Sequence, residues 1–395
     1  MMRPCFRPTR FRWHVPAALL AAAFLSAATP AAAQGPYRLI HGDILRHAES
    51  PDAARLLAPP PTAGQLAYDV LHYDLDVAIF PGVREIDGTV AVTVSCLAAG
   101  LDSIELDLDP SYGVLMTTDA GGMPLARTRP GDHVVIHLAG PLAAGEETTV
   151  VVHWTGSPEA ADEPGLFFRE YLGEPLVFSL SQPWSARAWW PCKDVPEDKA
   201  TFDLAFAVPA GLVAASNGVL VESGPDTLRG EPCDVYRWRT NHPMAVYLAS
   251  VAAYPYTTIE DVFEYAPGDT MPVVHYVFPS REWVCRQDFS ITVPALGFFS
   301  SIFGPYPFAD EKYGAALCDI GGGMEHQTLT SYGWQLADGT HRYDWVFVHE
   351  MSHQWFGDAV TCHDWSEIWL NEGFASYAEA LWFEHVDGPA ALRDY

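Results

Sequence analysis

The first half of the chain alternates apolar and polar residues with a period of two. Between about residues 68 and 254 such segments recur, separated by glycine, proline and aspartate. They read YDVLHYDLDVAIF, GTVAVTVSCL, SIELDLD, HVVIHLAG, TTVVVHW, ATFDLAFAVP and AVYLASVAAY. Short alternating segments with turn residues between them are typical of half-buried strands in antiparallel sheets. We therefore predict an antiparallel β domain over residues 66–255.

In the second half the apolar residues recur with helical spacing, as in RYDWVFVHEMSHQWFG and SEIWLNEGFASYAEALWFEHV. In the latter segment spacings of three to six residues indicate a buried helix, on the evidence of Ile368, Phe374, Tyr377 and Leu381. The change of pattern places a domain boundary near residue 256. The predicted fold class is mixed, with the β domain followed by an α/β domain over residues 256–395.

The first 33 residues have the order of a secretory signal peptide. Four arginines and no acidic residue precede the apolar stretch AALLAAAFLSAA, and small residues follow up to Ala33. This order predicts cleavage near Ala33 and a secreted or periplasmic protein. Residues 34–65 contain five prolines and predict an extended lead-in. No segment reaches about 18 uninterrupted apolar residues, so we expect no membrane anchor.

Composition narrows the possible partners. The 395 residues are 49% hydrophobic, enough for two separate cores. The formal net charge of -28 should repel phosphate backbones and anionic lipid, so nucleic acid is not an expected partner. Six of the seven cysteines lie beyond the predicted leader, none in a C-x-x-C arrangement. We expect buried thiols or one or two disulfides, whose pairing stays open.

The helical half contains an H-E-x-x-H motif, at residues 349–353. A spacing of four on a helix places His349 and His353 on one face, where both can bind one cation. Glu350 follows the first histidine directly and leans toward the same space, which suits a general base. The motif also arises by chance in helices, but an export signal and a further glutamate favour a metal site.

A catalytic zinc site needs a third protein ligand and an open position for water. Glu372 follows His353 after 18 intervening residues, which include a helix stop at Gly357 and Asp358 and a new helix start. That length lets a second helix return against the first. Two histidines and a carboxylate form the ligand class of zinc peptidases, so the residues predict one Zn²⁺ ion and hydrolysis.

Four sequence blocks resemble the aminopeptidase N family, which includes leukotriene hydrolase. They are GGGMEHQTLTSY (321–332), VHEMSHQWFGDAVT (348–361), WLNEGFASYAEA (369–380) and SQPWSARAWWPCKDVPEDKATFDL (181–204). The resemblance implies a thermolysin-like catalytic domain. It also implies a zinc-dependent aminopeptidase that acts on peptides with a free N-terminus, with zinc-activated water and Glu350 as general base.

The resemblance also assigns substrate contacts. Glu325 takes the place of the family's glutamate that binds the substrate α-amino group, and Gln182 that of a second amine anchor, which is glutamate in many relatives. A turn role for Gln182, before a proline, stays open. His326 replaces the usual asparagine and is expected to add a titrating group near the substrate. Gly322 and Gly323 fit a strand edge whose backbone approaches the substrate.

One departure from the family concerns the end of the chain. The family's oxyanion donor is a tyrosine some sixty or more residues beyond the third ligand, whereas only 23 residues follow Glu372 here. We therefore expect an incomplete catalytic domain and weak activity of the chain alone. Two alternatives remain: a catalytically weak or inactive peptide-binding protein, and an epoxide-hydrolysing relative.

Overall fold

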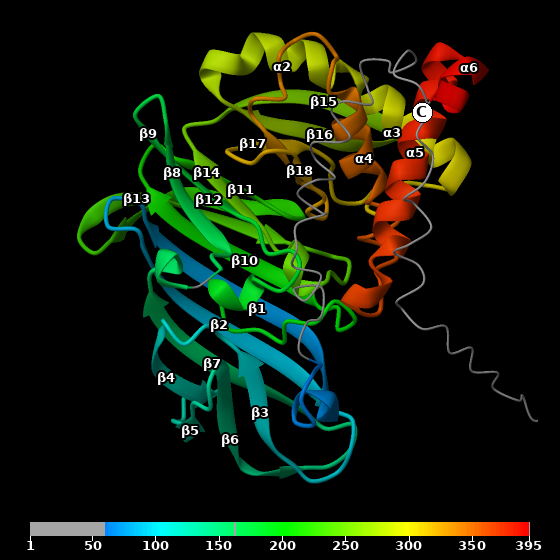
Figure 1. Cartoon of the computed structure of the whole chain (residues 1–395). Coiled ribbons are helices and arrows are strands. Elements are labelled where there is room, and N and C mark those ends of the chain that lie inside the picture. The colour runs from blue at the N-terminus through cyan, green and yellow to red at the C-terminus, as the bar shows by residue number, and fades with distance from the viewer. Residues whose placement is uncertain (1–59, 162, 395) are drawn as a thin grey trace, which may run out of the picture. The chain divides into compact units, whose positions relative to one another are not determined.

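The alternating segments of the N-terminal half form a seven-stranded sheet in the computed structural model, which describes residues 60–161 and 163–394 (Figure 1). Apolar residues of alternate positions face the core, as in β2, where Ile86, Val90, Val92 and Val94 are fully buried. In spatial order its strands are β12 (Val219–Leu228), β13 (Glu231–Arg239), β10 (Thr201–Pro209), β1 (Tyr68–Phe80), β2 (Glu85–Cys96), β7 (Glu147–Gly156) and β4 (Gly113–Asp119).

One pair of this sheet departs from the predicted antiparallel arrangement. Strands β1 and β10 run parallel, with His72 beside Thr201 and Ala78 beside Ala207. Parallel neighbours cannot be joined by a hairpin, and here eight strands and some 120 residues separate the two along the chain. Alternation reports which face of a strand is buried but not which strand it pairs with. The prediction of a purely antiparallel domain was therefore wrong at this pair.

Two smaller sheets complete the N-terminal half, and both are antiparallel. The first contains β11 (Val213–Ser216), β14 (Val251–Tyr254), β9 (Glu174–Ser179) and β8 (Leu166–Tyr171). The second contains β3 (Leu101–Asp107), β6 (His133–Leu142) and β5 (Arg127–Thr128). The β-rich character predicted for this half is confirmed.

The C-terminal half combines a mixed five-stranded sheet with helices, as predicted. In spatial order the strands are β15 (Thr257–Ala266), β16 (Asp269–Val277), β17 (Ala315–Cys318), β19 (Thr330–Gly333) and β18 (Gly323–Met324). The helices are α2 (Glu282–Asp288), α3 (Thr292–Phe303), α4 (Asp344–Ser352), α5 (Trp369–Asp387) and α6 (Pro389–Asp394). Short 3₁₀ turns cover Gln65–Ala67, Pro158–Ala160, Ala186–Ala188, Val246–Leu248, Pro279–Arg281, Phe289–Ile291 and Trp365–Glu367.

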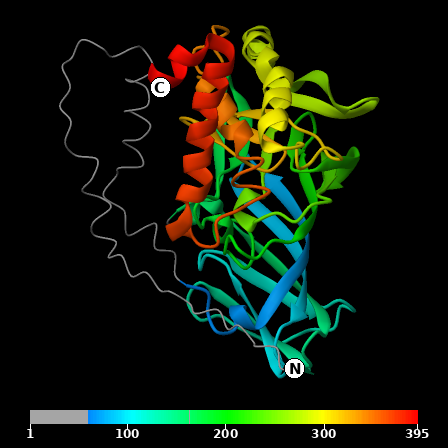
Figure 2. The same ribbon diagram turned by 90° about the vertical axis from the view of Figure 1, so that its right-hand side faces the viewer.

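Helices α3, α4 and α5 contact one another, and both views show α4 and α5 side by side (Figures 1 and 2). The buried face of α5 is built from small residues and Trp382, with Asn371 and Glu379 also fully buried. By contrast Phe374 and Tyr377, on which the prediction of a buried helix rested, are 38% and 55% exposed. The predicted helix is therefore confirmed, but the prediction that these two residues are buried was wrong, because the close approach to α4 selects the alanine face rather than the aromatic one.

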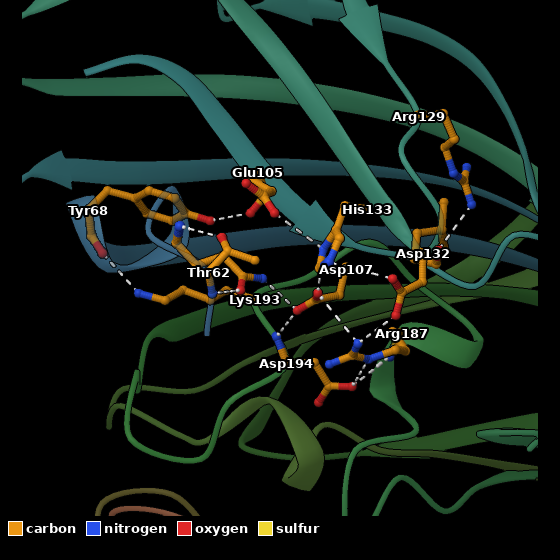
Figure 3. A network of polar contacts seen from close by, with 12 residues as sticks. Thr62, Tyr68, Glu105, Asp107, Arg129, Asp132, His133, Arg187, Lys193 and Asp194 are labelled. Atoms are coloured by element: carbon orange, nitrogen blue, oxygen red, sulfur yellow. Dashed lines mark hydrogen bonds and ion pairs between the residues drawn. The ribbon is translucent and has the colours of Figure 1, made fainter. Parts of the chain in front are cut away.

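A network of buried charges fixes the segment that follows β9 (Figure 3). The Asp107 carboxylate accepts hydrogen bonds from the Gln65 side chain at 2.8 Å and from the Asp194 backbone at 2.9 Å. Arg187 donates to the Asp194 carboxylate at 3.1 Å and pairs with Asp132 at 3.1 Å. Burial raises the pKa of Asp194 to about 6, although Arg187 opposes that rise. Because these groups compensate one another, they hold residues 181–198 against β3.

The predicted signal peptide and most of the lead-in lie outside the described residues. No helix among the described residues has the length and apolarity needed to cross a membrane. The six cysteines beyond the leader are all buried free thiols. The domain boundary near residue 256 stays a prediction.

Close packing of Gly88 against Trp154 gives a test of the large sheet. The two residues face each other on β2 and β7, and a β-carbon at Gly88 would lie 2.2 Å from the indole. We expect Gly88→Ala to lower the free energy of unfolding by about 1–3 kcal/mol through overpacking. Denaturant unfolding measures this. Gly224→Ala in β12, where a β-carbon meets no atom within 4 Å, is the matched control. Equal effects of both would contradict the packing argument.

Candidate metal centre and active site

The H-E-x-x-H motif lies at the C-terminal end of α4. His349 is in the last turn of the helix and His353 is the residue that follows it, still with helical backbone angles. Their ring centroids are 4.7 Å apart. The chain then turns at Gly357, which has a φ of 142°. A β-carbon at this position would lie 2.9 Å from Nδ1 of His353, so both the backbone angle and the close contact require glycine. The turn leaves room for α5 beside the two imidazoles.

Three ligand atoms meet between α4 and α5. The Nε2 atoms of His349 and His353 are 3.0 Å apart, and Oε2 of Glu372 lies 3.3 Å and 3.7 Å from them. A tetrahedral zinc with bonds of about 2.0–2.2 Å separates its ligand atoms by about 3.3–3.6 Å, and the three distances scatter around that range. The side chains predicted as ligands therefore form one candidate site for a metal ion.

The partners of the two histidines aim their Nε2 atoms at this centre. Nδ1 of His349 lies 2.5 Å from a carboxylate oxygen of Glu379, and Nδ1 of His353 lies 3.0 Å from the carbonyl of Phe356. Both partners only accept, so each Nδ1 carries a proton. A cation between the two Nε2 atoms would take the place of a proton on either nitrogen, and both nitrogens would then direct a lone pair at it. This arrangement, with a carboxylate or carbonyl behind each histidine, is the usual surrounding of zinc ligands.

Electrostatics at the centre also favour a cation. Although burial opposes it, hydrogen bonds that His349 donates to the carboxylates of Glu372 and Glu379 raise the pKa of His349 well above its ordinary value. Burial alone would raise the pKa of Glu372, but His353 and His349 lower it to about 2. Glu325 and Glu350 are buried beside the same histidines, and burial raises the pKa of both carboxyls. A divalent cation would compensate this concentration of acidic groups.

Glu350 lies against the exposed edge of β18. A β-carbon at Gly323 would come within 2.3 Å of Cγ and 2.6 Å of the carboxyl carbon of Glu350, so only glycine fits there. The carboxylates of Glu350 and Glu325 and a ring nitrogen of His353 all lie within 4.8 Å of one another. Glu350 is thus close to the metal ligands without belonging to the His349, His353 and Glu372 set. Its position suits a group that exchanges protons beside the centre.

Two residues of the N-terminal β-rich part, Gln182 and Tyr247, reach the site and contact Glu325. Glu325 is 2% exposed, and its Oε1 lies 3.3 Å from the Tyr247 hydroxyl and 3.5 Å from Nε2 of Gln182. Tyr247 also accepts a hydrogen bond from the Asn371 side chain at 3.4 Å, next to Glu372 on α5. Gln182 and Glu325, 143 residues apart, are therefore neighbours as the resemblance implied.

Two other predicted residues differ in their surroundings. Gly322 directly precedes β18, and a β-carbon built on it has no atom within 4 Å, so it faces open space. His326 is fully buried, with Nδ1 2.9 Å from the Ser331 hydroxyl, and burial lowers the pKa of His326 to about 3. The expectation that His326 titrates near the substrate at neutral pH is wrong, since desolvation keeps the ring uncharged.

Sequence reasoning missed Glu379 and Tyr247. Glu379 follows Glu372 by seven residues, two helical turns, and that spacing on α5 offered a signal for a group behind the same site. Tyr247 lies in the N-terminal half, 78 residues before Glu325, and nothing local marks it.

Comparison with known families agrees with this geometry. Residues 70–248 match the peptidase M1 N-terminal domain, and residues 291–394 match the peptidase family M1 domain. The N-terminal domain match precedes the peptidase domain match along the chain, and the second contains His349, His353 and Glu372. The chain belongs to the M1 family of zinc metallopeptidases.

Among M1 relatives, aminopeptidase N of Bos taurus is 31% identical over 292 residues, covering 67% of this chain and 28% of the relative. Aminopeptidase B of Mus musculus is 28% identical over 342 residues, covering 79% of this chain and 50% of the relative. The chain thus spans half or less of the length of these two curated relatives.

Solved M1 structures share the fold. A mutant M1 zinc metallopeptidase from Deinococcus radiodurans, bound to a Tyr-Ser-Ala substrate, superposes with a TM-score of 0.69 at 29% identity, covering 84% of this chain and 74% of that one. A two-domain M1 zinc metallopeptidase mutant bound to L-arginine gives the same TM-score at 28% identity. The fold class of this chain, a β-rich domain followed by a mixed α/β catalytic domain, is that of the family.

The contact between Glu379 and His349 predicts a contribution to metal affinity. Glu379→Gln weakens the hydrogen bond that orients the ring, so we expect zinc affinity to fall about 10- to 100-fold. Competition against a chelator of known affinity measures it. Asp387→Asn, exposed on the same helix, is the control. An unchanged zinc dissociation constant in Glu379→Gln would contradict the role of this carboxylate.

Buried His326 predicts acid sensitivity of the fold. The unfolded imidazole binds a proton near pH 6.5, whereas the folded one does so only near pH 3, so stability falls as pH falls between these values. The slope is about 1.4 kcal/mol per pH unit for one such group. Burial also lowers the pKa of His275 to about 3, so this residue should add a similar slope.

We expect His326→Asn to reduce the dependence of unfolding free energy on pH by that amount between about pH 4 and 6, whatever it does to stability at neutral pH. Denaturant titrations at four or five pH values measure the slope. A variant whose slope equals that of the parent chain would show that His326 is not buried as a neutral ring.

Proposed function

We propose that this M1 family member is an exported zinc aminopeptidase that removes the N-terminal residue of peptides. The observation that carries the proposal is the spacing of the three ligand atoms, with the buried carboxylates of Glu350 and Glu325 beside one of the ligands. A ring nitrogen of His353, a proton-transfer group and a carboxylate for an ammonium lie within 4.8 Å of one another. The tripeptide complex of the Deinococcus radiodurans relative supports peptides as the substrate class.

His349, His353 and Glu372 would hold the zinc ion, which supplies Lewis acidity toward water and the scissile carbonyl when bound. Glu350 accepts the proton of the attacking water and delivers it to the leaving amine. The Gly323 backbone keeps the Glu350 carboxylate in place, because the side chain packs directly on it. Each proton transfer is thus assigned to a side chain that is fixed before substrate binds.

Glu325 explains why only the first peptide bond would be cleaved. The α-nitrogen of a residue lies about 2.5 Å from its own carbonyl carbon. An ammonium bound by Glu325 therefore places the first carbonyl beside Glu350 and His353, whose polar atoms lie within 4.8 Å of the Glu325 carboxylate. A blocked N-terminus would leave Glu325 buried without a charge partner, which disfavours internal bonds. Gln182 and Tyr247 orient the carboxylate from the N-terminal part.

Two variants separate metal binding from chemistry. We expect Glu350→Gln to keep the parent's zinc content and to lose about 10²- to 10⁴-fold in hydrolysis rate, because the proton acceptor is gone. We expect His353→Ala to lose zinc itself. Elemental analysis and an aminoacyl chromogenic amide, with its N-acetyl form as substrate control, provide the measurements.

Hydrolysis by Glu350→Gln at the parent rate would overturn the assignment of the base. Cleavage of the N-acetyl substrate as fast as the free amine would overturn the aminopeptidase assignment. A parent chain that binds zinc and peptides but does not hydrolyse them would instead support the non-catalytic peptide-binding alternative.

A further inference from the structure

The turn that carries Glu325 contains a residue in a rarely adopted conformation. Residues 325–329 connect β18 to β19, and within them Thr328 has a φ of 63°. A side chain branched at the β-carbon is seldom found in this left-handed region. Thr328 is also fully buried. Such backbone persists only where the surroundings impose it, and it is commonest at functional sites.

Contacts from three separate segments hold Thr328 in this conformation. Its backbone N–H donates to Oε1 of Gln354 at 2.8 Å. Its hydroxyl accepts from the Gly218 backbone N–H at 2.8 Å and from Nζ of Lys312 at 3.2 Å. The Gln327 carbonyl next to it accepts from the Asn217 side chain at 2.7 Å. The turn is thus fixed by Gln354 just beyond α4, by the segment before β17 and by the N-terminal part.

Gln354 is the contact that joins this turn to the metal centre. It directly follows the ligand His353 and is fully buried. Its Oε1 accepts from the Thr328 backbone and, at 3.2 Å, from the Tyr306 hydroxyl. Its Nε2 donates to the Glu325 carbonyl at 3.3 Å and to the Asp358 carboxylate at 2.6 Å. All four hydrogen-bonding positions of the amide are used, so its orientation is unambiguous.

We propose that Gln354 and the Thr328 turn are positioning elements that set the distance between the substrate's α-amino group and the zinc ion. Gln354 binds the turn at both ends, through the Glu325 carbonyl and the Thr328 N–H, while its own backbone adjoins a metal ligand. Any shift of the turn relative to α4 would move the Glu325 carboxylate away from the metal. The inference rests on the proposed function and adds the residues that fix the distance between the Glu325 carboxylate and the metal ligands.

A free amino acid tests this register without turnover. L-arginine can reach Glu325 with its amine and the zinc with its carboxylate at once, whereas Nα-acetyl-L-arginine can use only the carboxylate. The ratio of the two affinities therefore reports the distance between the two binding points. A residue that only stabilises the fold would leave this ratio unchanged.

The experiment compares Gln354→Met with the parent chain, both loaded with zinc, by calorimetric titration of the two ligands. We expect the ratio to fall at least about 10-fold, with zinc content equal to the parent's and with the affinity for Nα-acetyl-L-arginine changed by less than about threefold. Thr117→Val is the control, because the Thr117 side chain on the edge strand β4 is also buried and its hydroxyl donates to the Leu125 carbonyl, away from the site. It should lose stability and keep the ratio.

Thr328→Gly keeps the test decisive if Gln354→Met does not fold. Glycine adopts a φ of 63° freely but removes the hydroxyl that Gly218 and Lys312 hold, so the ratio should again fall. A folded Gln354→Met or Thr328→Gly protein with the parent ratio would overturn the positioning role. A zinc-loaded parent chain that does not prefer L-arginine would instead overturn Glu325 as the amine anchor, and with it the proposed function.

Discussion

The packing of α5 against α4 determines whether this protein can hold a metal ion. His349 and His353 share one helix, but a third ligand has to come from elsewhere, and the alanine face of α5 brings Glu372 within 3.7 Å of both imidazoles. The same packing places Glu379 behind His349. One helix pair therefore supplies both a ligand and the group that orients another ligand, and a change in their spacing would disturb both at once.

The acidic character of the centre follows from that packing. Four carboxylates surround the two histidines, and those of Glu325, Glu350 and Glu379 are buried whereas that of Glu372 is partly exposed. Without a cation such a group of charges would oppose folding, and with one it becomes a preorganised electrostatic environment. In the proposed function a metal ion and a substrate ammonium would supply the counter-charges of this site.

The N-terminal β-rich part contributes to the site rather than only to solubility. Gln182 and Tyr247 contact the Glu325 carboxylate, and Asn217 and Gly218 bind the turn beside it. The buried charge network around Asp107 and Arg187 fixes the segment that carries Gln182 (Figure 3). Because partners of the Glu325 carboxylate come from this part and the candidate metal ligands from the other, the geometry of the site depends on how the two parts pack together.

The sequence alone determined what depends on local spacing: period-two strands, the helical half, and the pairing of His349 and His353 on one face, since a helix fixes which residues share a face. Glu372 was a candidate third ligand, but its approach to the histidines depends on the packing of α5 against α4. The tertiary structure decided what depends on long-range contact. The parallel β1–β10 pair, the exposure of Phe374 and Tyr377, the neutral burial of His326 and the approach of Tyr247 to Glu325 all arise from partners far along the chain. Periodicity shows which positions along the chain are apolar, whereas only packing determines which of them are covered and by which neighbour.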